Sequence, residues 1–254
     1  MVILVLNCGS SSIKYQVLDV EATAHKLLAK GIVDRIGLAE GDLVHKPIGK
    51  DNFHLHQPIS NHTEGISLVL EALTDKEHGV ITSLDEVKAV GHRVAHGGEF
   101  FADSAVVTEE VKDKIRSLFA IAPLHNPANL EGILSIEKVL PSVPQVAVFD
   151  TSFHQSIPAR NYLYALPMEY YDKYRVRRYG FHGTSHKFVA KVGAELAGLD
   201  LGGVRAPLLN LEDGDEAIVD KVVSLVETST NLYCLLYRKH HTILTLTWVC
   251  GSIS

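Results

Sequence analysis

Residues 2–14 read VILVLNCGSSSIK, and the fold prediction starts from this stretch. The apolar, β-branched run Val2–Leu6 is typical of a buried strand, and it leads into turn-forming residues over Asn7–Ser12. Apolar and polar residues then alternate over Ile13–Val20, as they do in a half-buried strand. The stretch therefore predicts a strand, a tight turn and a second strand.

Working outward, further extended segments are expected at Leu27–Ile36 and around Phe53 and Leu55. Asn61 followed by Glu64 is the residue pair of a helix N-terminus, where a side chain caps the first free N–H groups. The helix that follows would bury one apolar stripe, formed by Ile66, Val69, Leu70 and Leu73.

Later in the chain, strand and helix patterns alternate. Buried strands are expected at Val87–Val90 and Val146–Phe149, the first leading into a glycine-containing loop, Gly91–Gly98. Helix starts are expected at Thr108, at Asn126 with Pro127 in the first helical position, and at Thr184. A run of strands followed by alternating strands and helices predicts an α/β chain.

Composition narrows the function classes. The chain has 254 residues, of which 46% are hydrophobic and 21% charged, so it can bury a core and is not disordered. The net charge of −6 argues against a general nucleic-acid binder. No signal peptide or run of 18 apolar residues is visible, so no membrane partner is expected. The cysteines Cys8, Cys234 and Cys250 form no C-x-x-C pair, and we expect a cytoplasmic location.

The turn after the first strand is the first candidate site. Successive N–H groups and serine hydroxyls suit phosphate oxygens, Lys14 adds a positive charge, and the amide oxygen of Asn7 suits a hydrated magnesium ion. The alternative is a serine-rich hairpin that carries a surface lysine.

Arg93, in the segment Gly91–Gly98, is the second candidate. Its planar guanidinium suits a carboxylate or a phosphate, although a structural ion pair is the alternative. The third candidate is Asp150, which follows a buried strand at the edge where α/β sheets bind ligands. Its alternative role is to cap the next turn.

His182 is the fourth candidate, because it lies just before a helix N-terminus that receives phosphoryl charge well. The alternative is a capping loop with solvated arginines. His54 and His56 would share one strand face, but no third metal ligand is placed by the sequence.

These segments, together with Ala122–Pro127, occur in an order that closely resembles the acetokinase family of the actin and sugar-kinase-like superfamily. The resemblance covers about residues 2–198, roughly the first half of a family member. It implies a ribonuclease-H-like α/β fold with a mixed sheet. Residues 1–150 would be the N-terminal domain, 151–200 the start of a truncated second domain, and 201–254 a divergent tail.

The resemblance also implies an activity, the reversible transfer of the γ-phosphoryl group of ATP to acetate with Mg²⁺, giving acetyl phosphate and ADP by direct in-line transfer. Small molecules would be its partners, with no nucleic acid and no membrane. The family forms homodimers largely through its second half, so dimerisation does not carry over to this chain.

Matched residues receive roles by the same resemblance. Asn7 contributes to the metal site, and Ser10, Ser12 and Lys14 lie along the phosphates. Arg93 holds the acetate carboxylate or the phosphoryl group, and His182 stabilises the transition state. Asp150 is the catalytic acid/base or an orienting carboxylate, and we favour orientation because acetate is already ionised at pH 7.

The small acyl pocket would be walled by Leu124 and Phe181. Ala95 departs from the valine that is more common in the family, which suggests room for propionate.

A larger departure lies after Leu201. The family's glycine-rich His-Leu-Gly-Asn-Gly loop and the second catalytic arginine are not found there, and Leu201–Ser254 shows no family counterpart. The spacing of Ile218, Val222, Leu225 and Val226 predicts an amphipathic helix over 218–226. Three hypotheses therefore stay open: a working acetate kinase, a non-catalytic fragment of one, and a kinase for another short-chain acid such as propionate or butyrate.

Overall fold

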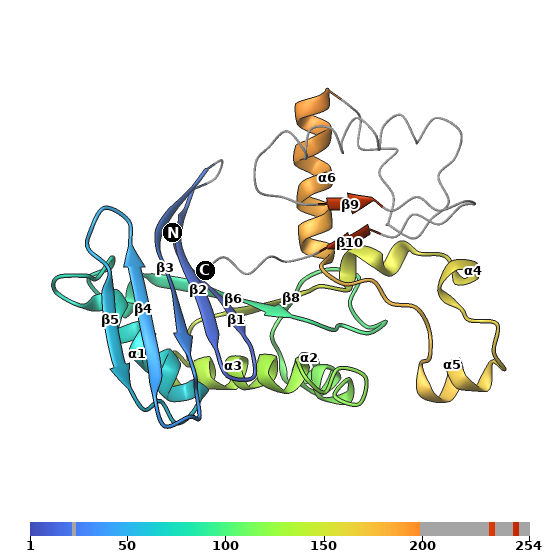
Figure 1. Cartoon of the computed structure of the whole chain (residues 1–254), viewed down its shortest axis with the longest axis horizontal. Helices are drawn as coiled ribbons and strands as arrows, with labels where there is room; N and C mark the ends of the chain where they lie inside the picture. Colours follow the sequence, from blue (N-terminus) through green and yellow to red (C-terminus); the bar gives the residue numbers. More distant parts are fainter. Residues whose placement is uncertain (22–23, 199–233, 237–245, 249–254) are drawn as a thin grey trace. The chain divides into compact units, whose positions relative to one another are not determined.

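The computed structural model describes residues 1–21, 24–198, 234–236 and 246–248. The chain divides into two units, Met1–Asp150 and Thr151–Ser254 (Figure 1). The tail 201–254, with its expected helix, lies outside the described residues apart from two short strands. No described helix is long and apolar enough to cross a membrane.

The first unit is built on a mixed sheet of eight described strands. In chain order these are β1 (Val2–Cys8), β2 (Ile13–Val20), β3 (His25–Asp34), β4 (Gly41–Pro47), β5 (Phe53–Gln57), β6 (Val87–Val94), β7 (Ala105–Val106) and β8 (Gln145–Phe149). The spatial order is β5-β4-β3-β2-β1-β6-β8-β7. The strands β5 to β1 are antiparallel neighbours, whereas β1, β6 and β8 are parallel. The expected mixed sheet is confirmed.

Helices cover one face of this sheet, as Figure 1 shows for the first unit. They are α1 (His62–Thr74), α2 (Glu109–Ser117) and α3 (Asn126–Val139), with a 3₁₀ turn, η1, at Leu84–Glu86. The core between sheet and helices contains Leu4, Ile13, Ile66 and Ile136, each fully buried. On the opposite face, side chains such as Asn7 and Lys14 are exposed, which follows from the alternation of a strand.

Strand boundaries differ from the prediction where polar residues end a strand. Asn7 was expected in the turn, but it pairs with Lys14 and belongs to β1. Arg93 was expected in a loop, but β6 continues to Val94 and pairs with β8. Strand β4 is not predicted from the sequence, because its buried positions include Gly41, His45 and Pro47, which leave no apolar alternation to detect.

Helix caps were predicted in part. Asn61 accepts the Glu64 N–H at 3.0 Å, and Thr108 accepts the Val111 N–H at 3.3 Å, so both caps are confirmed. The prediction for Asn126 was wrong: His125 holds the cap position, and Asn126 is the first helical residue. The Asn126 side chain is fully buried and hydrogen-bonds the backbone of His96, so it does not cap the helix.

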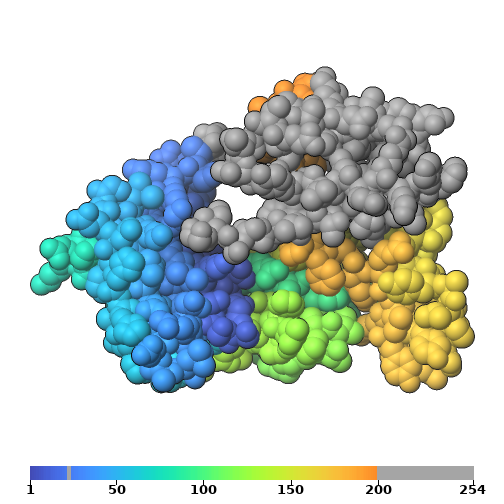
Figure 2. Space-filling view, in the orientation of Figure 1, coloured from blue at the N-terminus to red at the C-terminus, as the bar shows by residue number. Residues whose placement is uncertain are grey.

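The second unit holds η2 (Ser152–Ser156), α4 (Ala159–Tyr162), α5 (Glu169–Tyr174), α6 (Gly183–Ala197) and the antiparallel pair β9 (Cys234–Leu236) and β10 (Leu246–Trp248). Helix α6 begins one residue before the expected Thr184, and it ends at Gly198 in the left-handed conformation. The segment of α4 and α5, yellow in Figure 2, exposes the aromatic side chains Tyr164, Tyr170 and Tyr174.

The pairing of β6 with β8 buries His92, which is 2% exposed. Its Nε2–H donates to the Gln145 side-chain oxygen at 2.7 Å. Burial lowers the pKa of His92 to about 4, although the bond to Gln145 opposes that shift. Because an unfolded histidine titrates near pH 6.5, His92 is protonated in the unfolded chain but neutral in the folded chain between about pH 6.5 and about pH 4.

We therefore predict that His92 destabilises the first unit progressively as pH falls from about 6.5 to about 4, by at most about 1.4 kcal/mol per pH unit. Urea unfolding of the wild type and of His92→Gln across that range measures the effect, and the variant's curve is expected to be flatter. His54→Gln, at an exposed position, is the matched control. Parallel pH curves for the wild type and His92→Gln would contradict the prediction.

Candidate active site

Three parallel strands end beside one another at the carboxyl edge of the sheet. Asn7 lies near the end of β1, Arg93 near the end of β6, and Asp150 directly after β8. Ligands of open α/β sheets bind at this edge, because the loops that follow parallel strands diverge there. The topology thus gathers three of the predicted site residues from positions far apart in the sequence.

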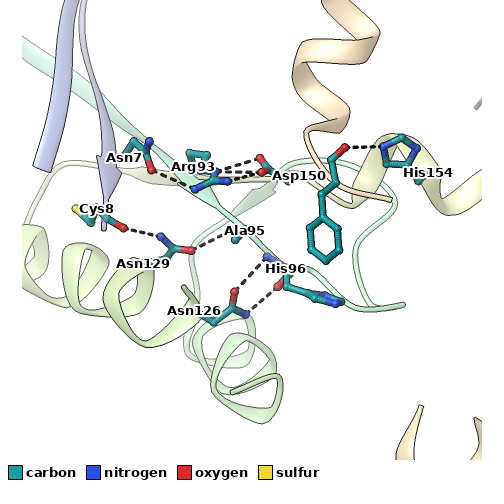
Figure 3. A network of polar contacts seen from close by, with 10 residues as sticks. Asn7, Cys8, Arg93, Ala95, His96, Asn126, Asn129, Asp150 and His154 are labelled. Atoms are coloured by element: carbon teal, nitrogen blue, oxygen red, sulfur yellow. Dashed lines mark hydrogen bonds and ion pairs between the residues drawn. The ribbon is translucent and has the colours of Figure 1, made fainter. Parts of the chain in front are cut away.

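Arg93 and Asp150 form a forked ion pair (Figure 3). The Arg93 Nε donates to both carboxylate oxygens, at 3.2 and 3.1 Å, and Nη2 donates to Oδ2 at 2.6 Å. The Asp150 side chain is only 6% exposed, whereas that of Arg93 is 33% exposed. A carboxylate this buried requires a charged partner, so the pair fixes the guanidinium in one orientation.

The free end of the guanidinium fork faces β1. Nη1 of Arg93 lies 3.4 Å from the Asn7 Oδ1, a long hydrogen bond. Lys14 is directly opposite Asn7 in the β1–β2 hairpin, and both side chains are exposed. Asn7, Lys14 and Arg93 therefore present an amide and two positive charges at this edge.

The turn between β1 and β2 is tied down on both sides. The Gly9 N–H donates to the Ser12 carbonyl at 2.7 Å, and the Nε2–H of His62 donates to the Gly9 carbonyl at 2.7 Å. Ser10 is exposed and Ser12 is half-buried, as phosphate-binding hydroxyls at a surface turn would be. The sequence analysis did not single out His62, because a histidine at a helix start carries no motif of its own.

Two buried asparagines of α3 hold the backbone near the strand ends, and the sequence analysis assigned neither to the site. Asn129 donates to the Cys8 carbonyl at 2.7 Å and accepts the Ala95 N–H at 2.9 Å. Asn126 donates to the His96 carbonyl at 2.9 Å and accepts the His96 N–H at 3.1 Å. The signal available in the sequence was two asparagines three positions apart on the apolar face of a helix.

The predicted pocket residues differ in exposure. Leu124 is 77% exposed, whereas Ala95 is 2% exposed with its N–H bound to Asn129. Phe181, 41% exposed, belongs to the second unit. Their roles as walls of an acyl pocket stay predictions.

His182 occupies the N-cap position of α6 in the second unit, with a left-handed backbone at φ 56°. Few non-glycine residues adopt this conformation, although histidine does so more often than most. The buried His154 ring packs against Gly180, where a Cβ atom would lie 2.7 Å from Nδ1, and its Nε2–H donates to the Phe181 carbonyl at 3.1 Å. The His154 ring also contacts the His186 ring. The pKa of His186 is lowered, mainly by burial and to a smaller extent by the charges of His154 and His182.

A magnesium ion fits the donor set at the strand ends. Mg²⁺ keeps several waters and takes one or two protein oxygens plus substrate phosphates, and Asn7 and Asp150 offer oxygens of that kind. Within the described residues no three His, Cys, Asp or Glu side chains cluster as a dedicated metal cage. His56, suggested with His54 as a weak zinc candidate, bonds Asp42 at 2.7 Å.

The chain is similar to known proteins in sequence and in structure. A model described as the acetokinase family matches residues 2–233. The chain is 49% identical over 229 residues to the acetate kinase of Caldanaerobacter subterraneus subsp. tengcongensis, covering 90% of this chain and 57% of that protein. The chain spans about half the length of the curated relatives it matches.

Solved structures agree. An acetate kinase from Porphyromonas gingivalis is 45% identical with a TM-score of 0.74, over 79% of this chain and 50% of that one. A propionate kinase from Francisella tularensis subsp. tularensis is 36% identical with a TM-score of 0.72, over 78% and 50%. The expected actin and sugar-kinase-like fold is confirmed. The family match continues to residue 233, past Gly198, where the motif-based resemblance was expected to end.

The ion pair generates a stability prediction. Arg93→Met leaves the nearly buried Asp150 carboxylate without its fork and should cost about 1–3 kcal/mol of unfolding free energy, less than a fully buried pair because Arg93 is partly exposed. Adding Asp150→Asn should recover part of that loss, giving a coupling of at least about 1 kcal/mol in a double-mutant cycle.

A second cycle on the exposed pair Arg116 and Asp113 is the matched control, with an expected coupling below about 0.5 kcal/mol. Equal coupling energies in the two cycles would show that Asp150 does not depend on Arg93.

Proposed function

This chain belongs to the acetokinase family, and we propose that it acts in the reversible transfer of the γ-phosphoryl group of ATP to acetate, giving acetyl phosphate and ADP. One observation carries the proposal. The guanidinium of Arg93 is held by a nearly buried carboxylate and points its remaining N–H groups toward Asn7, at the carboxyl ends of three parallel strands. A fixed guanidinium at this edge is suited to a carboxylate or phosphoryl substrate.

The proposed reaction needs charge neutralisation more than proton transfer. Acetate is ionised at pH 7, and its oxygen attacks the γ-phosphorus directly while the bond to the ADP oxygen breaks. Both reactants are anions, so the barrier falls when cationic groups align them and disperse the charge on the phosphoryl oxygens. Arg93 would bind the acetate carboxylate or the phosphoryl group, and Lys14, Ser10 and Ser12 would lie along the phosphates.

Asp150 is proposed to orient Arg93 rather than to remove a proton. Its carboxylate accepts from Nε and Nη2, the two donors on one side of the guanidinium. That arrangement leaves the Nη1 side directed away from the carboxylate and toward Asn7. A general base would instead need a substrate proton to accept, and ionised acetate carries none.

His182 and the metal complete the proposal. A histidine at a helix N-terminus is suited to stabilising phosphoryl charge in the transition state, and the left-handed backbone of His182 supports a specialised role. Asn7, with Asp150 nearby, would hold a hydrated Mg²⁺, which neutralises phosphate charge when bound. The cytoplasmic location stays a prediction from the sequence.

A second candidate acid is propionate. Alanine at position 95 and the similarity to a propionate kinase favour testing it. One methylene is worth about 1–3 kcal/mol in an apolar pocket, so any preference between the two acids is expected to be modest. Butyrate is the next larger substrate for the same comparison.

We predict that the purified chain, given ATP, Mg²⁺ and acetate, forms acetyl phosphate that hydroxylamine traps. Arg93→Ala, prepared in the same way, should lose at least about 100-fold in rate, and this variant also measures contaminating host enzyme. Asp150→Asn should lose a similar factor because the fork is no longer held by a charge. Arg116→Ala, an exposed arginine outside the site, should keep the wild-type rate.

Turnover that equals the Arg93→Ala background would favour the alternative that this chain is a non-catalytic piece of an acetate kinase. Full activity in Asp150→Asn would overturn the orienting role. Similar rates with acetate and propionate would favour the wider pocket, and a strong preference for acetate would exclude it.

A further inference from the structure

The parallel pairing of β1 with β6 stops just before the candidate site. The register runs from Val2 opposite Val87 to Leu6 opposite His92. Beyond that point Asn7 pairs with β2, and Arg93 pairs with β8. The two site residues therefore stand on neighbouring strands at the place where the ladder between those strands has ended.

Asn129 spans the gap that follows. Its Nδ2 donates to the Cys8 carbonyl, the residue after Asn7, and its Oδ1 accepts the N–H of Ala95, two residues after Arg93 (Figure 3). The two distances are 2.7 and 2.9 Å, and Asn129 is 2% exposed. One side-chain amide thus replaces the missing backbone ladder between β1 and β6.

A side chain that satisfies both strands must carry a donor and an acceptor, as the Asn129 amide does. The Cys8 carbonyl needs a donor and the Ala95 N–H needs an acceptor, and a buried group left unsatisfied is costly. Helix α3 approaches β1 closely enough for this contact because Gly132 lies against Cys8, where a Cβ atom would come within 3.1 Å of the Cys8 Cβ. Asn126, one turn earlier on α3, binds both backbone groups of His96 in the same manner.

We propose that Asn129 is a positioning residue that sets the separation between Asn7 and Arg93 by tying together the ends of β1 and β6. Its effect on phosphoryl transfer rests on the proposed function, but the tie and its effect on Arg93 do not. Because the amide is buried and bonded at both ends, it holds the strand ends apart at one distance before any substrate binds.

The substitution Asn129→Asp provides a switchable test. A protonated carboxyl group can donate to the Cys8 carbonyl while it accepts from Ala95, so at acidic pH it imitates the amide. Once ionised, the carboxylate is an acceptor only and faces the Cys8 carbonyl oxygen with no proton between them. The defect is therefore expected to appear as pH rises and to disappear as pH falls.

Two readouts do not depend on activity. The unfolding equilibrium constant of Asn129→Asp should exceed that of the wild type by about tenfold or more at pH 7.5, and the excess should vanish only below about pH 4, where the aspartate of the unfolded chain is protonated as well. The Nε–H resonance of Arg93, assigned by its loss in Arg93→Lys, should shift or broaden in the variant at pH 7.5 and return to its wild-type position at pH 5.5.

Controls separate the tie from other effects. Asn52→Asp makes the same charge change at an exposed position and should match the wild type at both pH values. Asn129→Leu removes donor and acceptor together, so its Arg93 resonance should be displaced at both pH values. If Asn129→Asp does not fold at pH 7.5 but folds at pH 5.5 with the wild-type Arg93 resonance, the tie is supported.

An Arg93 resonance that is unchanged in Asn129→Asp at pH 7.5, in a folded and destabilised variant, would overturn the positioning role and leave Asn129 with stability alone. Where the wild type turns over acetate, kcat of Asn129→Asp should fall by about tenfold or more at pH 7.5 and recover toward the wild type at pH 5.5. A wild type without turnover would count against the proposed function only, because the resonance still decides the tie.

Discussion

The end of the β1–β6 ladder is the constraint on which the site depends. Up to Leu6 and His92 the backbone of each strand satisfies the other, and the spacing of the sheet follows from those bonds. Past that point each strand keeps its other neighbour only, so the backbone groups that face the gap must find other partners. Helix α3 supplies them through Asn129 and Asn126, whose side-chain amides bond the backbone at the strand ends.

At this edge, the Arg93–Asp150 pair fixes the Arg93 side chain relative to the backbone of the strand ends. Asp150 is fixed by its own N–H, which donates to the Val94 carbonyl at 3.0 Å, and its carboxylate in turn fixes the guanidinium. The Asp150 side chain is nearly buried, whereas the Arg93 side chain that it holds is partly exposed. This gradient is what a binding group requires: an immobile support and an accessible tip.

The parts of the site predicted from the sequence are those that local chemistry marks. A glycine- and serine-rich turn after an apolar run, an arginine near a strand end and a carboxylate after a buried strand are each visible one segment at a time. The asparagines of α3 were not assigned because their partners lie 30 to 121 positions away, and no local pattern encodes such a contact. The prediction of a helix cap at Asn126 fails for the same reason: the local pattern suits a cap, but the side chain bonds the distant His96 backbone instead. Leu124 shows the converse, since an apolar residue in a recognised motif is exposed here.

In the proposed reaction, the charge balance at this edge limits how two anionic reactants would be brought together. Of the described residues of the first unit that form it, Arg93 and Lys14 are cationic, and Asp150 offsets one of them. What remains is a single excess positive charge, far less than a nucleotide triphosphate and a carboxylate bring. The Asp150 carboxylate therefore weakens the attraction of Arg93 for anions while it fixes the orientation of the guanidinium. The proposed Mg²⁺, bound to the nucleotide, would supply the missing positive charge. Under the proposed function, such a site would attract its anions mainly when Mg²⁺ is bound to the nucleotide, because the protein alone supplies one excess positive charge.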